Sequence, residues 1–80
     1  MDQAEREDLL LAVQRVMARS GRLPVAADLA DMVHKPLPDV IEFLSRLTDD
    51  GEVNVANDGS VRLTSRGEAA AAVVMKKHKV

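Results

Sequence analysis

Residues 52–63, EVNVANDGSVRL, decide the fold, because here the spacing of apolar residues changes from the period of a helix to that of a strand. Apolar and polar residues alternate on both sides of Asn57-Asp58-Gly59, which is the pattern of half-buried strands. The triplet itself is a strong hairpin signal, since a type I′ turn needs positive φ at both central residues. We therefore predict a two-stranded β-wing over 52–63.

Helical patterns lie on both sides of this wing. Apolar residues in the preceding segments recur at the i, i+3, i+4 spacing of an amphipathic helix. Gly21 and Gly51 suit helix ends, Pro38 fits a first turn, and Thr64 or Ser65 suits the cap of the segment after the wing. The predicted helices run over about residues 3–19, 26–33, 38–50 and 65–79.

The same periodicity gives an expected core. The residues expected to face inward on the first three helices are Leu9, Leu10, Val13, Val16, Met17, Leu29, Met32, Val33, Val40, Leu44 and Leu47. On the third helix this orientation leaves Ile41 pointing outward. Phe43 lies either at the margin of the core or beneath the wing.

The order of the elements is helix, helix, turn, helix, wing and helix, which is the arrangement of a winged helix-turn-helix. The expected fold class is α+β, mostly α, with three helices, a two-stranded β-wing and a C-terminal helix. A chain of 80 residues has the size of one small domain. We therefore expect residues 1–80 to form a single winged helix-turn-helix domain.

The composition excludes several functional classes. The chain has no Cys, which excludes disulfides and thiolate metal sites, and its one aromatic residue argues against a base-stacking platform. With two His, no Tyr and little area for a deep cleft, we expect no enzyme. The longest apolar stretch, Ala69–Met75, is too short to cross a bilayer, and the acidic first residues do not fit a signal peptide. We expect a cytoplasmic protein without a membrane partner.

The charge is unevenly distributed. The 11 basic and 13 acidic residues give a net charge of −2, yet three of the lysines fall within the last five positions. The rest of the chain is therefore more acidic than the total suggests. Because affinity for nucleic acid depends on neutralising phosphates, charge alone does not predict DNA binding.

Three segments carry a resemblance to a known family: Asp50-Gly51-Glu52-Val53, Leu63-Thr64-Ser65-Arg66-Gly67 and Val74-Met75-Lys76-Lys77-His78. They resemble metal-dependent repressors of the diphtheria-toxin-repressor and manganese-transport-regulator type, without gaps from about Glu7 to His78. The resemblance implies a domain that binds operator DNA as a dimer. It also implies Fe(II) or Mn(II) between the first helix and helices that follow the wing.

The resemblance places two residues at metal-ligand positions, Asp8 and His78. Leu9 and Leu11 are apolar where family members have further ligands, and the family's dimerisation helices would begin after Val80. One carboxylate and one imidazole do not complete an octahedral site, so we expect no cofactor in this chain. A longer protein that completes the site would hold Mn(II) or Fe(II). Otherwise Asp8 is a solvated acid of the first helix and His78 an exposed histidine.

The third helix of a winged helix-turn-helix enters the major groove with its N-terminal part. The candidate DNA-binding residues are Lys35, Pro36, Pro38, Asp39, Ile41, Glu42, Arg46 and Arg62. The basic ones are candidate phosphate contacts. Carboxylates can accept a hydrogen bond from cytosine N4, although phosphates repel them.

Two hypotheses about function follow. The chain is the DNA-binding domain of an iron- or manganese-responsive transcriptional regulator, with double-stranded operator DNA as its partner. Alternatively, it is a winged-helix module that docks a protein partner through an acidic and apolar third helix, because exposed Ile41 beside Phe43 would form an apolar patch. Pairing of the Ala-rich last helix with a second copy, as a homodimer, stays open.

Overall fold

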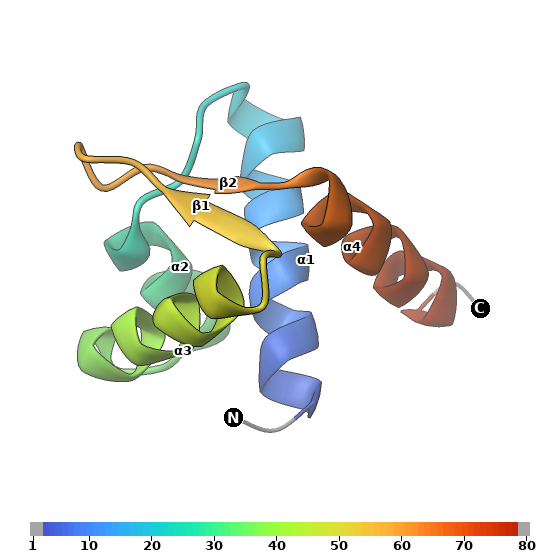
Figure 1. The fold of residues 1–80 in the computed structure, drawn as a ribbon, viewed down its shortest axis with the longest axis horizontal. Coiled ribbons are helices and arrows are strands. Elements are labelled where there is room, and N and C mark those ends of the chain that lie inside the picture. The colour runs from blue at the N-terminus through green and yellow to red at the C-terminus, as the bar shows by residue number, and fades with distance from the viewer. Residues whose placement is uncertain (1–2, 79–80) are drawn as a thin grey trace.

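The computed structural model describes residues 3–78, and the side chains of residues 3–77. Its elements are α1 (Gln3–Ser20), α2 (Ala26–Val33), α3 (Leu37–Asp49), β1 (Val53–Val55), β2 (Val61–Leu63) and α4 (Ser65–His78). Figure 1 shows α1 crossing the molecule, with α2 and α3 on one side, α4 on the other and the hairpin across it. The predicted fold class is confirmed: three helices, an antiparallel hairpin and a C-terminal helix.

The start of α3 differs slightly from the predicted one. Pro36 is the N-cap, with extended backbone angles, and the helix begins at Leu37 rather than at residue 38. Pro38 therefore lies in the first turn, where its missing N–H removes no helical hydrogen bond. The rings of Pro36 and Pro38 restrict the backbone φ angle at these two residues, which fixes the direction in which α3 leaves the turn.

The core lies where α1, α2, α3 and the hairpin meet. Its buried residues are Leu9, Leu10, Ala12, Val13, Leu29, Val40, Leu44, Leu47, Val53, Val61 and Ala71. The predicted inward face of α3 is confirmed, because Val40, Leu44 and Leu47 are all buried. Phe43 is half-buried and packs against this core. It therefore lies at the margin of the core, which is one of the two positions that the sequence left open.

Two methionines of the expected core are exposed instead. Met17 lies in the last turns of α1 and Met32 near the end of α2, and their exposed fractions are 42% and 36%. In their place Leu11 and Ala12 are buried. The reason is that α1 packs against α4 and β2 as well as α2, so its buried surface is wider than one helical stripe.

The hairpin turn differs from the predicted type. Val53 pairs with Leu63 and Val55 with Val61, but at the tip only Gly59 has a positive φ, of 91°. The Ala56 N–H donates to the Ser60 carbonyl at 2.8 Å, and the Gly59 N–H donates to the Ala56 carbonyl at 2.9 Å. This is a three-residue loop closed by a glycine in the left-handed region, so the prediction of a type I′ turn was wrong.

The strand β2 also pairs with the segment that links α1 to α2. The Val61 N–H donates to the Pro24 carbonyl at 2.8 Å, and Val25 forms a bridge with Ser60. The link between α1 and α2 therefore acts as a short third strand. Pro24 disfavours helical backbone at the residue before it, but nothing nearby in the sequence indicates that this link pairs with the hairpin.

The tip of the hairpin contains an acidic group with a shifted pKa. The Ser60 hydroxyl and the Ser60 N–H both donate to Asp58, the latter at 2.9 Å. These bonds favour the charged carboxylate, so they hold the pKa of Asp58 below its ordinary value of 3.8.

Because the folded pKa of Asp58 is lowered, this tip gains stability above pH 3.8 and loses it as the pH falls through the folded value. We expect an NMR titration of the Asp58 carboxyl carbon to give a midpoint below 3.8. Ser60→Ala removes the larger cause, the side-chain hydrogen bond, and should move the midpoint upward. An unchanged midpoint would contradict this assignment.

Thr64 caps α4 and ties it to the chain before β1. Its Oγ1 accepts from the Gly67 N–H at 3.1 Å and donates to the Gly51 carbonyl at 2.6 Å. The Thr64 N–H donates to the Glu52 carbonyl at 3.0 Å. The cap of α4 is therefore Thr64, and its hydrogen bonds bring the first turn of α4 against the backbone at Glu52.

Glu52 is buried, although it stands in an alternating pattern that suggested an exposed side chain. Its exposed fraction is 2%, and Arg6 of α1 donates to its Oε1 through both Nε, at 2.8 Å, and Nη2. A second ion pair joins Glu7 of α1 to Lys77 of α4 at 3.5 Å. These pairs fasten the start of α1 to the base of the hairpin and to the end of α4.

Candidate nucleic-acid interface

Seven of the eight candidate DNA-binding residues lie in α3 or in the turn that leads into it. They are Lys35, Pro36, Pro38, Asp39, Ile41, Glu42 and Arg46, and all are exposed. Lys35 lies in the turn before α3, and the others follow it along the N-terminal part and outer face of that helix. Burial of the opposite face against the core is what turns this face outward. We call these seven residues the α3 surface.

The α3 surface carries both signs of charge. Glu42 and Arg46 form an ion pair one helical turn apart, with 3.2 Å between Arg46 Nη2 and Glu42 Oε1. Asp39, in the first turn, makes no ion pair with any described residue. A carboxylate in the first turn of a helix is favourably placed in the field of the helix dipole. The surface is therefore polar and mixed rather than strongly basic.

An apolar groove of about 360 Å³ lies on the surface between α3 and the hairpin. Ile41 lines it from α3 and Val55 from β1, with exposed fractions of 54% and 47%. The sequence predicted the exposure of Ile41. It did not predict that of Val55, because strand alternation puts Val55 on the same face as buried Val53. Val55 is exposed at the end of the strand that leads to the tip.

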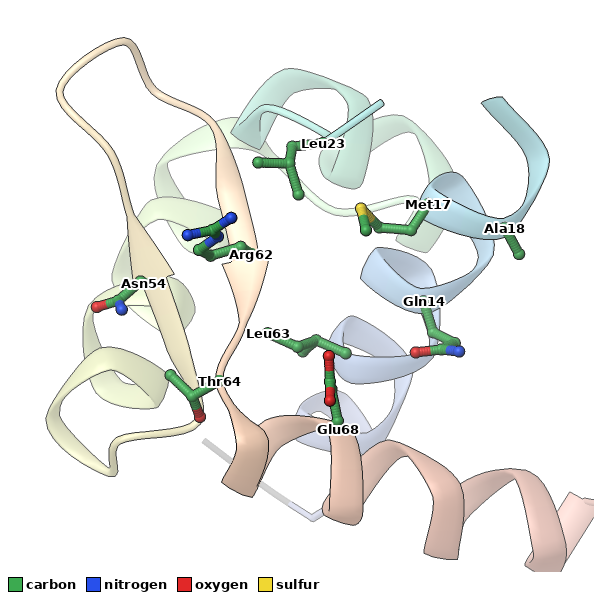
Figure 2. Close-up of a pocket in the computed structure, with 9 residues that line it drawn as sticks. All are labelled: Gln14, Met17, Ala18, Leu23, Asn54, Arg62, Leu63, Thr64 and Glu68. Carbon is green, nitrogen blue, oxygen red and sulfur yellow. The ribbon is translucent and has the colours of Figure 1, made fainter. Parts of the chain in front are cut away.

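Arg62, the eighth candidate, lies on the other face of the hairpin. It pairs with Asn54 in the register of the two strands, so its side chain points away from Val55 and Val61. With Asn54 and Glu68 it lines an open pocket of about 530 Å³ between α1, the hairpin and α4, whose lining residues Figure 2 labels. The structure therefore does not bring Arg62 into the α3 surface.

The described residues do not form a metal site around the two candidate ligands, Asp8 and His78. Asp8 is exposed on α1 and lines a groove with His34. His78 is the last residue of α4, and its side chain lies outside the described residues. Among the described residues there is no group of three or more His, Asp or Glu side chains that could hold a metal ion.

His34 has a conformational role that the sequence did not indicate. It ends α2 with φ 57° and ψ 45°, in the left-handed region, which residues other than Gly rarely adopt and His adopts more often than most. Its N–H donates to the Ala30 carbonyl. This conformation reverses the chain so that Lys35 and α3 follow directly.

None of the helices in residues 3–78 has the length and apolar character needed to cross a membrane.

Comparison with models of protein families gives no match. Among curated proteins, the chain is 29% identical over 79 residues to the diphtheria toxin repressor of Corynebacterium efficiens, across 99% of the chain and 34% of that protein. It is 34% identical over 64 residues to the iron-dependent repressor IdeR of Mycobacterium tuberculosis, across 80% of the chain and 28% of that protein. The diphtheria toxin repressor of Corynebacterium diphtheriae is 29% identical, across 99% of the chain and 35% of that protein.

The chain spans about a third of the length of these relatives. All three are named as repressors rather than enzymes, which agrees with the expectation that this chain is not an enzyme. The resemblance noted in the sequence is thus found by direct comparison, on a fold of the predicted class. The chain is homologous, over nearly its whole length, to the N-terminal region of the metal-dependent repressor family that includes diphtheria toxin repressor and IdeR.

Proposed function

We propose that residues 1–80 are a single winged helix-turn-helix domain that binds double-stranded operator DNA, with α3 in the major groove. The observation that carries the proposal is that the outer face of α3 stays exposed beside the hairpin, in a chain homologous to repressors. In this proposal the domain serves a cytoplasmic transcriptional regulator that responds to iron or manganese.

The residues of the α3 surface have distinct roles in this proposal. Lys35 approaches the phosphates, since it carries an exposed cationic group just before the start of α3. Arg46 is exposed on the outer face of α3, beside Glu42. Asp39, Ile41 and Glu42 face the base edges. Arg62 contacts the backbone only where DNA reaches the outer face of the hairpin, because its side chain is on the other side from α3.

The metal response in this proposal depends on groups outside the described residues. Asp8 and His78 are at most two ligands of an N/O site, which is fewer than Mn(II) or Fe(II) requires. We therefore propose that the 80 residues bind neither ion by themselves. The effect of a metal would reach them from the rest of a longer regulator.

A salt titration of duplex binding tests the proposal. We expect the full chain to bind duplex DNA at low salt, with an affinity that falls steeply as salt rises, because counterions are released from the DNA. Lys35→Ala should weaken binding to all sequences similarly and reduce the slope of log affinity against log salt by about one. Absence of binding to operator-like and random duplexes at low salt would reject the proposal.

Arg19→Ala is the matched control for this titration. Arg19 is exposed in the last turn of α1, and Figure 1 shows that end of α1 far from α3. The substitution removes the same charge as Lys35→Ala. An equal loss of slope in both variants would show that overall charge, and not the α3 surface, drives the binding.

A protein-docking module is the second candidate function. The observation in its favour is the apolar groove between α3 and the hairpin, where Ile41 and Val55 are both about half exposed. Exposed apolar patches rimmed by polar groups often mark protein contacts. The salt titration separates the two candidates, because a module of this kind would show no duplex binding at low salt.

A further inference from the structure

The Glu42–Arg46 ion pair is the one ion pair that the described residues place on the α3 surface. Both side chains are more than half exposed, at 62% for Glu42 and 54% for Arg46. Their contact joins a hydrogen-bond acceptor to a forked donor on the outward side of α3. Neither side chain is part of the buried core.

We propose that this pair selects the DNA sequence, with Glu42 reading a cytosine and Arg46 a nearby guanine. The inference rests on the proposed DNA-binding function. In the major groove, cytosine offers only the N4 amino donor, which a carboxylate accepts, whereas guanine offers O6 and N7, which a guanidinium bonds as a pair. The chemistry of the two side chains therefore matches these two bases.

The spacing of the pair fits neighbouring base pairs. Four residues of helix advance by about 6 Å, and stacked base pairs advance by about 3.4 Å each. A helix lying along the groove would therefore bring Glu42 and Arg46 to bases within about two base-pair steps. The preferred site should contain a C and a G at that separation.

The ion pair also removes the main objection to a carboxylate in the major groove. A lone carboxylate is repelled by the phosphates, but Glu42 and Arg46 enter together without net charge. Their contact restricts both side chains before DNA arrives, which reduces the entropy lost on binding. Asp39 and Asp49 make no ion pair with any described residue, so on α3 only Glu42 has this advantage.

Selection from a pool of random duplexes, read by sequencing, tests the inference. The wild-type chain should enrich duplexes with C and G within two base-pair steps of each other. Glu42→Gln should change the preferred C to A, because an amide bonds adenine N6 and N7, with a roughly tenfold change in relative affinity. Replacing the selected guanine by 7-deazaguanine, which lacks the N7 acceptor, should weaken wild-type binding by roughly tenfold as well.

Asp49→Asn is the matched control. It removes the same charge from the same helix at an exposed position, so it should strengthen binding to all duplexes without changing the preferred bases. Circular dichroism checks that each variant is folded. Enrichment without a C and G preference, or equal effects of Glu42→Gln and Asp49→Asn, would overturn the inference and leave the proposed DNA binding intact. Failure of the wild-type chain to retain any duplex would overturn both.

Discussion

Gly67→Ala is expected to lower the free energy of unfolding by about 3 kcal/mol or more, which is beyond the usual range of one added methyl group. A Cβ at this position would overlap the carbonyl oxygen of Glu52 and lie 2.9 Å from its carbonyl carbon. A backbone oxygen cannot turn aside as a flexible side chain can. Relief would require α4 to move away from the hairpin, and that movement would break the hydrogen bonds that Thr64 makes.

Urea or thermal unfolding measures this loss, and a small domain shifts its melting temperature by about 4–8 °C for each kcal/mol. Gly21→Ala is the control. Gly21 has a φ of 67°, but a Cβ added there would have nothing within 4 Å of it, so only the left-handed backbone opposes Ala, at about 1–2 kcal/mol. Gly67→Ala could instead be as stable as the wild type, or more stable because Ala has the better helix propensity. Either result would show that the close approach of the Glu52 carbonyl is not the reason for a glycine at position 67.

Residue patterns were sufficient to predict the elements of the fold. A helical period places Val40, Leu44 and Leu47 on one face of α3, and that face is buried because only it is apolar throughout. The outward position of Ile41 follows from the same period. The candidate site was therefore predictable wherever it depends on a single helix.

The features that were not predicted depend on contacts between distant parts of the chain. Alternation marks Glu52 as a polar residue in a strand, and nothing nearby in the sequence indicates that Arg6 lies against it. Likewise, the exposure of Met17 depends on how far α4 and β2 cover α1. Arg62 is a different case: it directly follows Val61 in an alternating strand, and that was enough to place it on the other face from α3.

Arg6→Met is expected to lower the free energy of unfolding by about 3 kcal/mol, because it leaves a buried carboxylate without its partner. Glu52 is 2% exposed, so water cannot replace the hydrogen bonds that Arg6 donates. Arg6 is 32% exposed and can be hydrated when Glu52 is replaced. Glu52→Gln alone should therefore be less damaging than Arg6→Met, and the double variant Arg6→Met/Glu52→Gln should recover part of the loss.

A double-mutant cycle in urea measures this coupling, and Lys77→Met supplies the control. Lys77 pairs with Glu7 on the same end of α1, but its side chain is 57% exposed, so breaking that pair should lower stability by less than about 1 kcal/mol. The comparison isolates burial as the cause, because both variants remove a cation that holds the start of α1. Equal losses in Arg6→Met and Lys77→Met would mean that the carboxylate of Glu52 does not depend on Arg6, and that the hairpin holds its position against α1 by packing alone.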